Sequence, residues 1–416
     1  MQKISSLELF EKPSVIFYKN DRIEFNQQSL KNQLVETSYV KKVYASNELK
    51  SAEAVFIEPR SVKVLNAKPA TRNEKRFVTK VSHEVAPLYL RNYNSENVLK
   101  LHKGVLKDFQ ALHYELNDGT LWKAYFSGQR LVSIEKQGSQ FNEFTAQVYP
   151  LGPKHSDLTE VLLKGLQLNT SVSNQYVLVD SESSQKMTSV LPHLKFDPKD
   201  ERFDQVQVFY YLDYIQTWMR ENLSVRFPEK LNAVVDVGYP DKTNTAFYFQ
   251  NKIRFGRGDD VDYGMLASDP SIVYHESFHA LIDGMARLPF EKEGGSLNEG
   301  FADFFTCVVL NRPFLGETAY LKGPFKRTIQ ANIRLSEKTG GLYHDSQILS
   351  SLLWEIKEKL GKEKSLKLAT DTLSKLNPNS DFNHFNSQII EVIKLMPAKD
   401  QEIVNPILAS RGFNYE

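Results

Sequence analysis

The sequence is poor in the features that would assign it to several large classes of protein. It holds a single cysteine, Cys307, among 416 residues, which excludes an intramolecular disulfide and a cysteine-rich structural zinc module. No apolar run approaches the roughly 18 residues that a helix needs to span a bilayer. Basic and acidic residues nearly balance, at 52 and 51, so there is no electrostatic reason to expect a nucleic-acid partner. What remains is a chain long enough for two domains, each with a core of its own.

The first residues leave the compartment open. The segment from Met1 to Lys12 lacks the uninterrupted apolar core that is typical of a signal peptide. The sequence alone is therefore compatible with a cytoplasmic protein, or with an exported one whose signal has been removed.

Residues 1–149 are expected to form a strand-rich α+β domain. Residues 14–25 alternate in polarity around a turn and predict a hairpin, and two turn sequences within residues 111–135 predict an antiparallel meander. Residues 84–107 have a helical period and are expected to form a helix on that sheet. A polar, turn-rich stretch starts at Pro150, so we place the boundary with a second domain, residues 150–416, at this point.

The second domain is expected to begin with mixed structure and to end in helices. A buried helix is predicted over residues 203–226, a strand over 233–237 and a hairpin over 246–255. Asp269 as a cap and Pro270 at the first position mark the start of another helix, which should stop before Pro289. Further helices are predicted over residues 296–310, 326–336, 344–359, 363–376, 384–396 and 400–410.

Two of these helices carry residues with the spacing of a metal site. His275 and His279, at positions i and i+4, project from one face of a helix and can close on a single cation. Glu276 lies about 100° round the helix from His275, where it can take a proton from a water that the metal activates. Two ordinary histidines would be the alternative for this motif alone. Glu299, as a third ligand, and Asp303, one turn later, favour the metal site.

The paired motif resembles that of a known family. His275-Glu276-Ser277-Phe278-His279, followed after twenty residues by Glu299 within Asn298-Glu299-Gly300-Phe301-Ala302-Asp303, is similar to the motif of the thermolysin and fungalysin group of zinc metallopeptidases, the gluzincins. The resemblance implies an α+β fold, in which a strand-bearing lobe and a helical C-terminal lobe follow a small α+β domain. It also implies a peptide or protein substrate, a monomer, and a place outside the cell or in its envelope or periplasm. The roles it implies are Zn²⁺ ligation by His275, His279 and Glu299, general base catalysis by Glu276, and support of a ligating histidine by Asp303.

The same resemblance implies three further site residues. Ala246 would lie on an edge strand that binds extended substrate. His344 would donate a hydrogen bond to the oxyanion, unless it is an exposed histidine at a helix start. Arg327 would hold a substrate carbonyl, although Arg334 competes for this role and either could be a surface charge.

The chain also departs from the family pattern. Phe290 stands where a tyrosine assists the oxyanion, Thr245 stands where an asparagine binds substrate, and Lys338 and Thr339 replace the aspartate that orients the second histidine. A catalytically impaired peptide-binding or zinc-stabilised relative is therefore the rival hypothesis. An aminopeptidase would need an acidic cluster for a free amino terminus, and no such motif is found.

Two other interpretations stay open at this point. The acidic run Asp259–Asp262 could hold Ca²⁺, or it could be a solvated turn. The N-terminal domain resembles a propeptide that would make the protein a zymogen cleaved near residues 140–160. A permanent accessory domain is the alternative.

Overall fold

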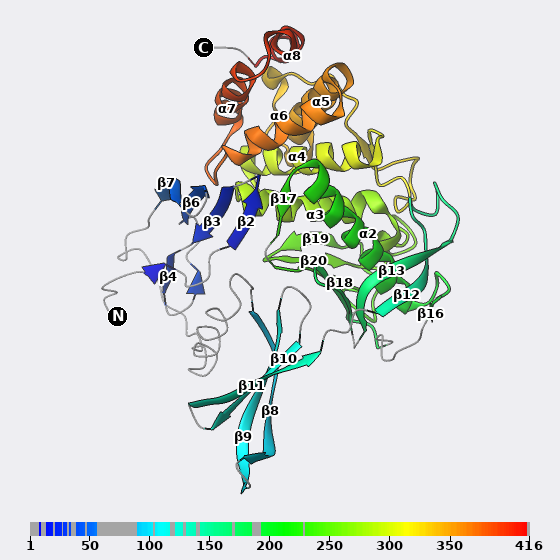
Figure 1. Ribbon diagram of the computed structural model, residues 1–416. Coiled ribbons are helices and arrows are strands. Elements are labelled where there is room, and N and C mark those ends of the chain that lie inside the picture. The colour runs from blue at the N-terminus through cyan, green and yellow to red at the C-terminus, as the bar shows by residue number, and fades with distance from the viewer. Residues whose placement is uncertain are drawn as a thin grey trace, which may run out of the picture.

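The computed structural model describes residues 142–168, 171–184, 193–227 and 229–413 and, ahead of these, the strands between residues 8 and 138 together with Lys19. The fold is α+β, as the sequence predicts: strands dominate the N-terminal part and helices the C-terminal part (Figure 1). None of the described helices combines the length and the apolar composition needed to cross a lipid bilayer.

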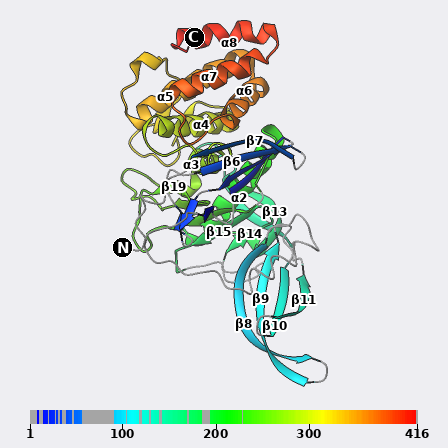
Figure 2. The same ribbon diagram turned by 90° about the vertical axis from the view of Figure 1, so that its left-hand side faces the viewer.

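The N-terminal strands form three sheets. The four-stranded sheet lies at the opposite end of the molecule from the C-terminal helices, as Figures 1 and 2 both show. The three-stranded sheet contains β1 (Glu8–Leu9), β4 (Gln28–Leu30) and β5 (Gln33–Leu34); the four-stranded sheet contains β8 (Leu90–His102), β9 (Val105–Leu116), β10 (Leu121–Ser127) and β11 (Arg130–Gly138); the five-stranded sheet contains β2 (Ser14–Tyr18), β3 (Asp21–Asn26), β6 (Tyr39–Ala45), β7 (Glu48–Val55) and β17 (Val225–Arg226).

The structure confirms two predictions for this part and corrects a third. Strands β2 and β3 form the predicted hairpin, and β9, β10 and β11 form the antiparallel meander. The helix predicted over residues 84–107 is wrong where the structure describes it, because residues 90–102 pair along their length with β9. Residues 84–89 lie outside the described residues. Most of β9, the pairing partner of β8, lies beyond the predicted helix, so a local helical period could not show the pairing.

A central eight-stranded sheet links the two parts of the chain. Helix α2 (Glu201–Asn222) packs on it and places Val206, Leu212 and Ile215 in the core, with their side chains fully buried. The predicted domain boundary follows directly after the strand β12, which is paired with β13 in this sheet. The strand order is β16 (His193–Leu194), β12 (Asn142–Val148), β13 (Thr159–Leu168), β14 (Val172–Ser173), β15 (Val177–Ser181), β18 (Leu231–Val235), β20 (Lys252–Phe255) and β19 (Ala246–Phe249).

The remaining chain is almost entirely helical. The helix α3 starts after Asp269, whose carboxylate accepts a hydrogen bond from the backbone of Ser271, and ends before Pro289 as predicted. The helix predicted over residues 326–336 is wrong, because part of it is drawn into a small sheet with β21 and the rest is loop and a single 3₁₀ turn. The elements are η2 (Leu266–Ser268), α3 (Pro270–Met285), α4 (Lys292–Leu310), β21 (Phe314–Leu315), β22 (Arg327–Thr328), η3 (Leu335–Glu337), α5 (Leu342–Leu360), α6 (Lys362–Ser374), α7 (Phe382–Lys394) and α8 (Ala398–Ser410).

Helices α3, α4 and α5 pack closely around a continuous aromatic core. Phe278 of α3 stacks on Phe305 of α4 with ring centroids 5.2 Å apart. At Gly300 of α4 a Cβ atom would lie 2.8 Å from the carbonyl oxygen of Ser346 in α5. The glycine that follows Glu299 therefore allows α5 to approach α4 closely.

The five-stranded N-terminal sheet is docked against the back of α3. Ile16 of β2 is fully buried, and a Cβ atom added at Gly284 of α3 would lie 3.0 Å from its Cδ1 atom. Strand β2 also pairs with β17, which follows α2. The N-terminal strands thus share a core with the helix that carries the paired histidines.

This close contact makes a testable prediction. Gly284→Leu should destabilise the protein by about 1–3 kcal/mol, because the added side chain overpacks against Ile16. In an Ile16→Ala background the same change should cost at least about 1 kcal/mol less, since the alanine leaves room for it. Urea unfolding of the two single variants and the double variant measures this coupling. Strictly additive costs would contradict the docking of β2 on α3.

Candidate metal centre

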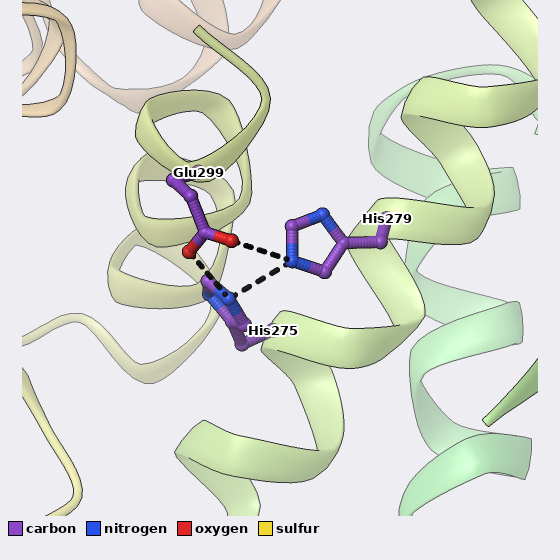
Figure 3. A group of neighbouring side chains, drawn as sticks. All are labelled: His275, His279 and Glu299. Carbon is purple, nitrogen blue, oxygen red and sulfur yellow. Dashed lines mark hydrogen bonds and ion pairs between the residues drawn. The ribbon is translucent and has the colours of Figure 1, made fainter. Parts of the chain in front are cut away.

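Three potential metal ligands converge between two helices. Helix α3 supplies His275 and His279, and α4 supplies Glu299, so that the three side chains face one another (Figure 3). Their ligand atoms all lie within 4.8 Å of one another. The Nε2 atoms of the two histidines are 3.0 Å apart, and Glu299 lies 3.3 Å from the first and 3.6 Å from the second.

Hydrogen bonds at the Nδ1 atom of each imidazole fix the orientation in which its Nε2 atom faces the space between the three side chains. Asp303 lies 2.9 Å from Nδ1 of His275, and the side-chain oxygen of Asn298 lies 2.8 Å from Nδ1 of His279. The amide nitrogen of Asn298 donates to the backbone oxygens of Leu288 and Pro289, so its oxygen is the atom left to accept from His279. Both Nδ1 atoms therefore carry a proton, so each Nε2 atom presents a lone pair whenever its ring is neutral.

This arrangement places three acceptors together in a buried space. The Oε2 atom of Glu299 accepts no hydrogen bond of standard geometry from the described residues, and it lies 3.3 Å from Nε2 of His275, a nitrogen that donates only when the ring is protonated. Two lone pairs and a carboxylate repel one another unless a positive charge lies between them. A proton or a metal ion can supply that charge, and a set of two histidines and one glutamate fits Zn²⁺ with a ligand position left open.

The pKa values of the site residues also indicate that a positive charge is favoured at this centre. Burial favours the neutral form of His275, but its hydrogen bonds with Asp303 and Glu299 outweigh burial and raise its pKa to about 10. Burial likewise favours neutral Glu299, yet contact with His275 lowers its pKa to about 2. Burial also opposes the ionisation of Asp303, and the charge of Arg327 holds its pKa well below the usual range. The carboxylates remain charged and attract a cation.

Arg327 is the arginine that the structure brings to this centre. Its Nε and Nη2 atoms donate to the two oxygens of Asp303 at 2.8 and 2.6 Å, and Nη2 lies 3.8 Å from Glu299. Arg334 is exposed at the start of η3. Arg327 therefore neutralises the carboxylate that supports His275. The bidentate pair also attaches residues 326–336, for which a helix is predicted from the sequence, to α4.

Glu276 lies beside the ligands and lines a cleft. The cleft has a volume of about 1060 Å³ and is also lined by His275, His279 and Glu299. Glu276 is 7% exposed, so its carboxylate is largely shielded from bulk water.

One wall of the cleft is formed by β19, the edge strand of the eight-stranded sheet. Ala246 lies on this strand, as predicted, and pairs with Phe255 of β20. Phe247 and Phe249 of the same strand are exposed large apolar residues. The cleft thus combines a free sheet edge with an apolar surface.

The start of α5 forms another part of the cleft lining. Nδ1 of His344 lies 2.9 Å from Asp345 and 3.3 Å from the hydroxyl of Thr339. Asp345 therefore contacts His344, although the sequence pattern indicated no aspartate for it. The neighbouring Tyr343 also lines the cleft, and the guanidinium of Arg327 lies 5.5 Å from its ring centroid.

Phe290 stands at the position where the family resemblance implies a tyrosine. It contributes an apolar ring without a hydroxyl group. It packs edge-on against His279 at 5.6 Å between centroids and is 47% exposed.

The acidic run Asp259–Asp262 has the geometry of a turn. The carboxylate of Asp259 accepts hydrogen bonds from three backbone N–H groups, which lower its pKa. Asp260 is paired with Lys242, and Asp262 lies 3.4 Å from Lys322. These contacts favour the solvated turn over a Ca²⁺ site, and calcium binding elsewhere stays an open prediction.

Sequence reasoning assigned no role to three residues of the site. Asn298 directly precedes Glu299 on the same helix. This adjacency was the one sign in the sequence that Asn298 lies near the candidate metal centre. Asp345 and Tyr343 flank the histidine that was singled out. Their contacts depend on how the loop before α5 folds.

Comparison with known proteins gives a consistent set of relatives. No protein-family model matches the chain. A zinc metalloproteinase of Listeria monocytogenes is 31% identical over 152 residues, which are 32% of this chain and 30% of that protein. An extracellular elastase of Staphylococcus epidermidis is 27% identical over 159 residues, covering 34% and 31% of the two chains. A bacillolysin of Brevibacillus brevis is 34% identical over 88 residues, covering 21% and 17%.

Among solved structures, the precursor of protealysin, a metalloproteinase from Serratia proteamaculans, aligns with a TM-score of 0.48 at 16% identity over 67% of this chain and 90% of that one. The aligned part of this chain spans about a third or less of the length of the curated relatives named above. The sequence relatives confirm the resemblance of this chain to the thermolysin-like zinc metallopeptidases.

Proposed function

We propose that the protein is a zinc-dependent endopeptidase that hydrolyses peptide bonds in peptide or protein substrates. The observation that carries this proposal is the convergence of two imidazole lone pairs and the Glu299 carboxylate beside Glu276, inside a cleft bounded by a free sheet edge. His275, His279 and Glu299 would hold the metal. The names of the sequence relatives support the class of activity.

Each neighbouring residue has a defined part in this proposal. Zn²⁺, when bound, supplies the Lewis acidity that activates a water and polarises the scissile carbonyl. Glu276 accepts the proton of the attacking water as general base and passes it to the leaving amine. Asp303 and Asn298 hold the two imidazoles in the tautomer that presents Nε2. A structural metal site would have no need of a base at Glu276.

The substrate would bind in an extended conformation along β19. An exposed edge strand offers backbone hydrogen bonds to a peptide, with Ala246 at its start. Phe247 and Phe249 offer apolar contacts beside it. Arg327 faces the metal ligands and could contact a substrate carbonyl with a donor that Asp303 leaves free.

Secretion or residence in the cell envelope or periplasm is part of the proposal. It agrees with the extracellular elastase among the relatives. We also propose that the protein acts as a monomer.

The rival proposal is a catalytically impaired relative that binds peptides or uses zinc for stability. Phe290 favours it, because an apolar ring cannot donate a hydrogen bond to an oxyanion. Hydrolysis of casein that phenanthroline blocks and added zinc restores would exclude the rival.

The role of Glu276 can be tested by a conservative substitution. Glu276→Gln should lower kcat by about 10²- to 10⁴-fold, because the amide cannot accept the proton, while the bound zinc stays at about one per chain. Turnover of a quenched-fluorescence peptide and metal analysis measure the two quantities. The control is Glu291→Gln, at a residue whose side chain is 76% exposed. Equal turnover by Glu276→Gln and wild type would refute the mechanism.

The supporting role of Asp303 can be tested without any activity. Asp303→Asn should weaken zinc binding by about 10- to 100-fold, because His275 loses the charged partner that orients it. Competition with a fluorescent zinc chelator gives the affinity. Asp283→Asn, on the neighbouring helix α3 at a carboxylate that is hydrogen-bonded to Tyr248, serves as control. An unchanged affinity in Asp303→Asn would contradict this role.

For the N-terminal domain we propose that the five-stranded sheet is a permanent part of the protein and no removable propeptide. Tyr18 and Lys19 bind Asp371 of α6, and Nζ of Lys41 donates to the carbonyl oxygens of Ser374 and Leu376 at 2.9 and 2.8 Å. Lys41 is 5% exposed, so these contacts are shielded from water. Together with the packing of β2 on α3, they attach the sheet to two helices of the catalytic part.

This proposal predicts the behaviour of a cut chain. A specific protease site inserted after Ser139 should yield two fragments that still elute together in size-exclusion chromatography. In an Ile16→Asp variant the fragments should separate, because a charge would enter the shared core. Separation of the wild-type fragments, with full activity in the C-terminal one, would support a propeptide instead. A spontaneous cut between residues 135 and 165 that depends on Glu276 would support a zymogen.

A further inference from the structure

The proposed cleft needs a hydrogen-bond donor for the oxyanion. The negative charge that develops on the scissile carbonyl oxygen is stabilised by preorganised donors in its vicinity. The ring of Phe290, against His279, offers none. Two candidates at the start of α5 are the adjacent residues Tyr343 and His344, which both line the cleft.

The side chains of Tyr343 and His344 are directed to different partners. Both lie in the first turn of α5, where consecutive residues diverge by about 100°. The imidazole of His344 is directed to Thr339 and Asp345, which belong to the loop before the helix and to the helix start. Tyr343 is directed to Arg327, 5.5 Å from its ring centroid.

Arg327 connects Tyr343 to the metal ligands. The same guanidinium group binds Asp303 and lies 3.8 Å from Glu299. The site also affects the Tyr343 hydroxyl electrostatically. Burial and the negative charges of Glu299 and Glu276 raise the pKa of Tyr343, so the phenol keeps its proton. No hydrogen bond of this hydroxyl to another described residue is recorded, which leaves its proton free for a ligand.

We infer that Tyr343, and not His344, donates the hydrogen bond that stabilises the oxyanion in the cleft. The assignment rests on the proposed peptidase function. The phenol donates through its O–H group and keeps its proton throughout, since Glu276 performs the proton transfer. His344 then acts through Asp345 and Thr339 on the loop before α5.

The matched pair Tyr343→Phe and His344→Gln tests this inference. Phenylalanine keeps the ring beside Arg327 and removes only the hydroxyl. We expect kcat of Tyr343→Phe to fall by about 10²- to 10³-fold with little change in KM, since the donor acts mainly in the transition state. His344→Gln should stay within a few-fold of wild type. Zinc content and melting temperature should not change in either variant.

A binding measurement gives a second readout that does not depend on turnover. A peptide phosphonamidate, whose tetrahedral anion mimics the transition state, should lose affinity for Tyr343→Phe in proportion to the loss in kcat/KM. A product peptide should bind wild type and variant alike. Isothermal titration calorimetry on zinc-loaded protein measures both ligands.

The outcomes separate the two levels of the proposal. Active wild-type protein with an unimpaired Tyr343→Phe variant, or with the larger loss in His344→Gln, would overturn the role of Tyr343 and leave the peptidase function standing. Wild-type protein that binds zinc but neither cleaves peptides nor binds the phosphonamidate would overturn the proposed function, and the role of Tyr343 with it.

Discussion

Three hydrogen-bond acceptors forced together in a buried space are the constraint on which the rest of this structure depends. The ligand atoms of His275, His279 and Glu299 lie within 4.8 Å of one another, and Oε2 of Glu299 accepts no hydrogen bond of standard geometry from the described residues. The helices can hold this arrangement only because Asp303 and Asn298 bind the opposite side of each imidazole ring. The remaining repulsion between these three groups is relieved when a cation lies between them. The packing of α3 on α4 therefore favours cation binding at this point.

The surrounding architecture serves to keep these helices in register. The stacked rings of Phe278 and Phe305 join α3 to α4, and Gly300 lets α5, whose start lines the cleft, approach α4 closely. The N-terminal sheet also packs on α3, where Ile16 of β2 contacts Gly284 of the helix. Residues far apart in sequence thus fix the position of the ligands, so the N-terminal strands are part of the scaffold of the site.

The two walls of the cleft differ in chemistry. The edge strand β19 offers backbone groups and exposed phenylalanines, which suit an extended peptide of apolar character. The start of α5 and Arg327 offer charge and hydroxyl groups next to the metal ligands. In the proposed peptidase, substrate binding and charge stabilisation would therefore be supplied by different parts of the cleft lining.

The sequence by itself identified the three side chains that converge at the candidate metal centre, the bounds of α3 and the α+β class. The i, i+4 spacing, the Asp269 cap and Pro270 act within a single helix, so local geometry suffices to interpret them. Only the tertiary structure decided that residues 90–102 form a strand, that residues 326–336 form no α-helix, and which side chain of the pair Tyr343 and His344 faces Arg327. These outcomes depend on partners contributed by other segments, such as β9, β21 and Asp303, and a local pattern carries no information about such contacts.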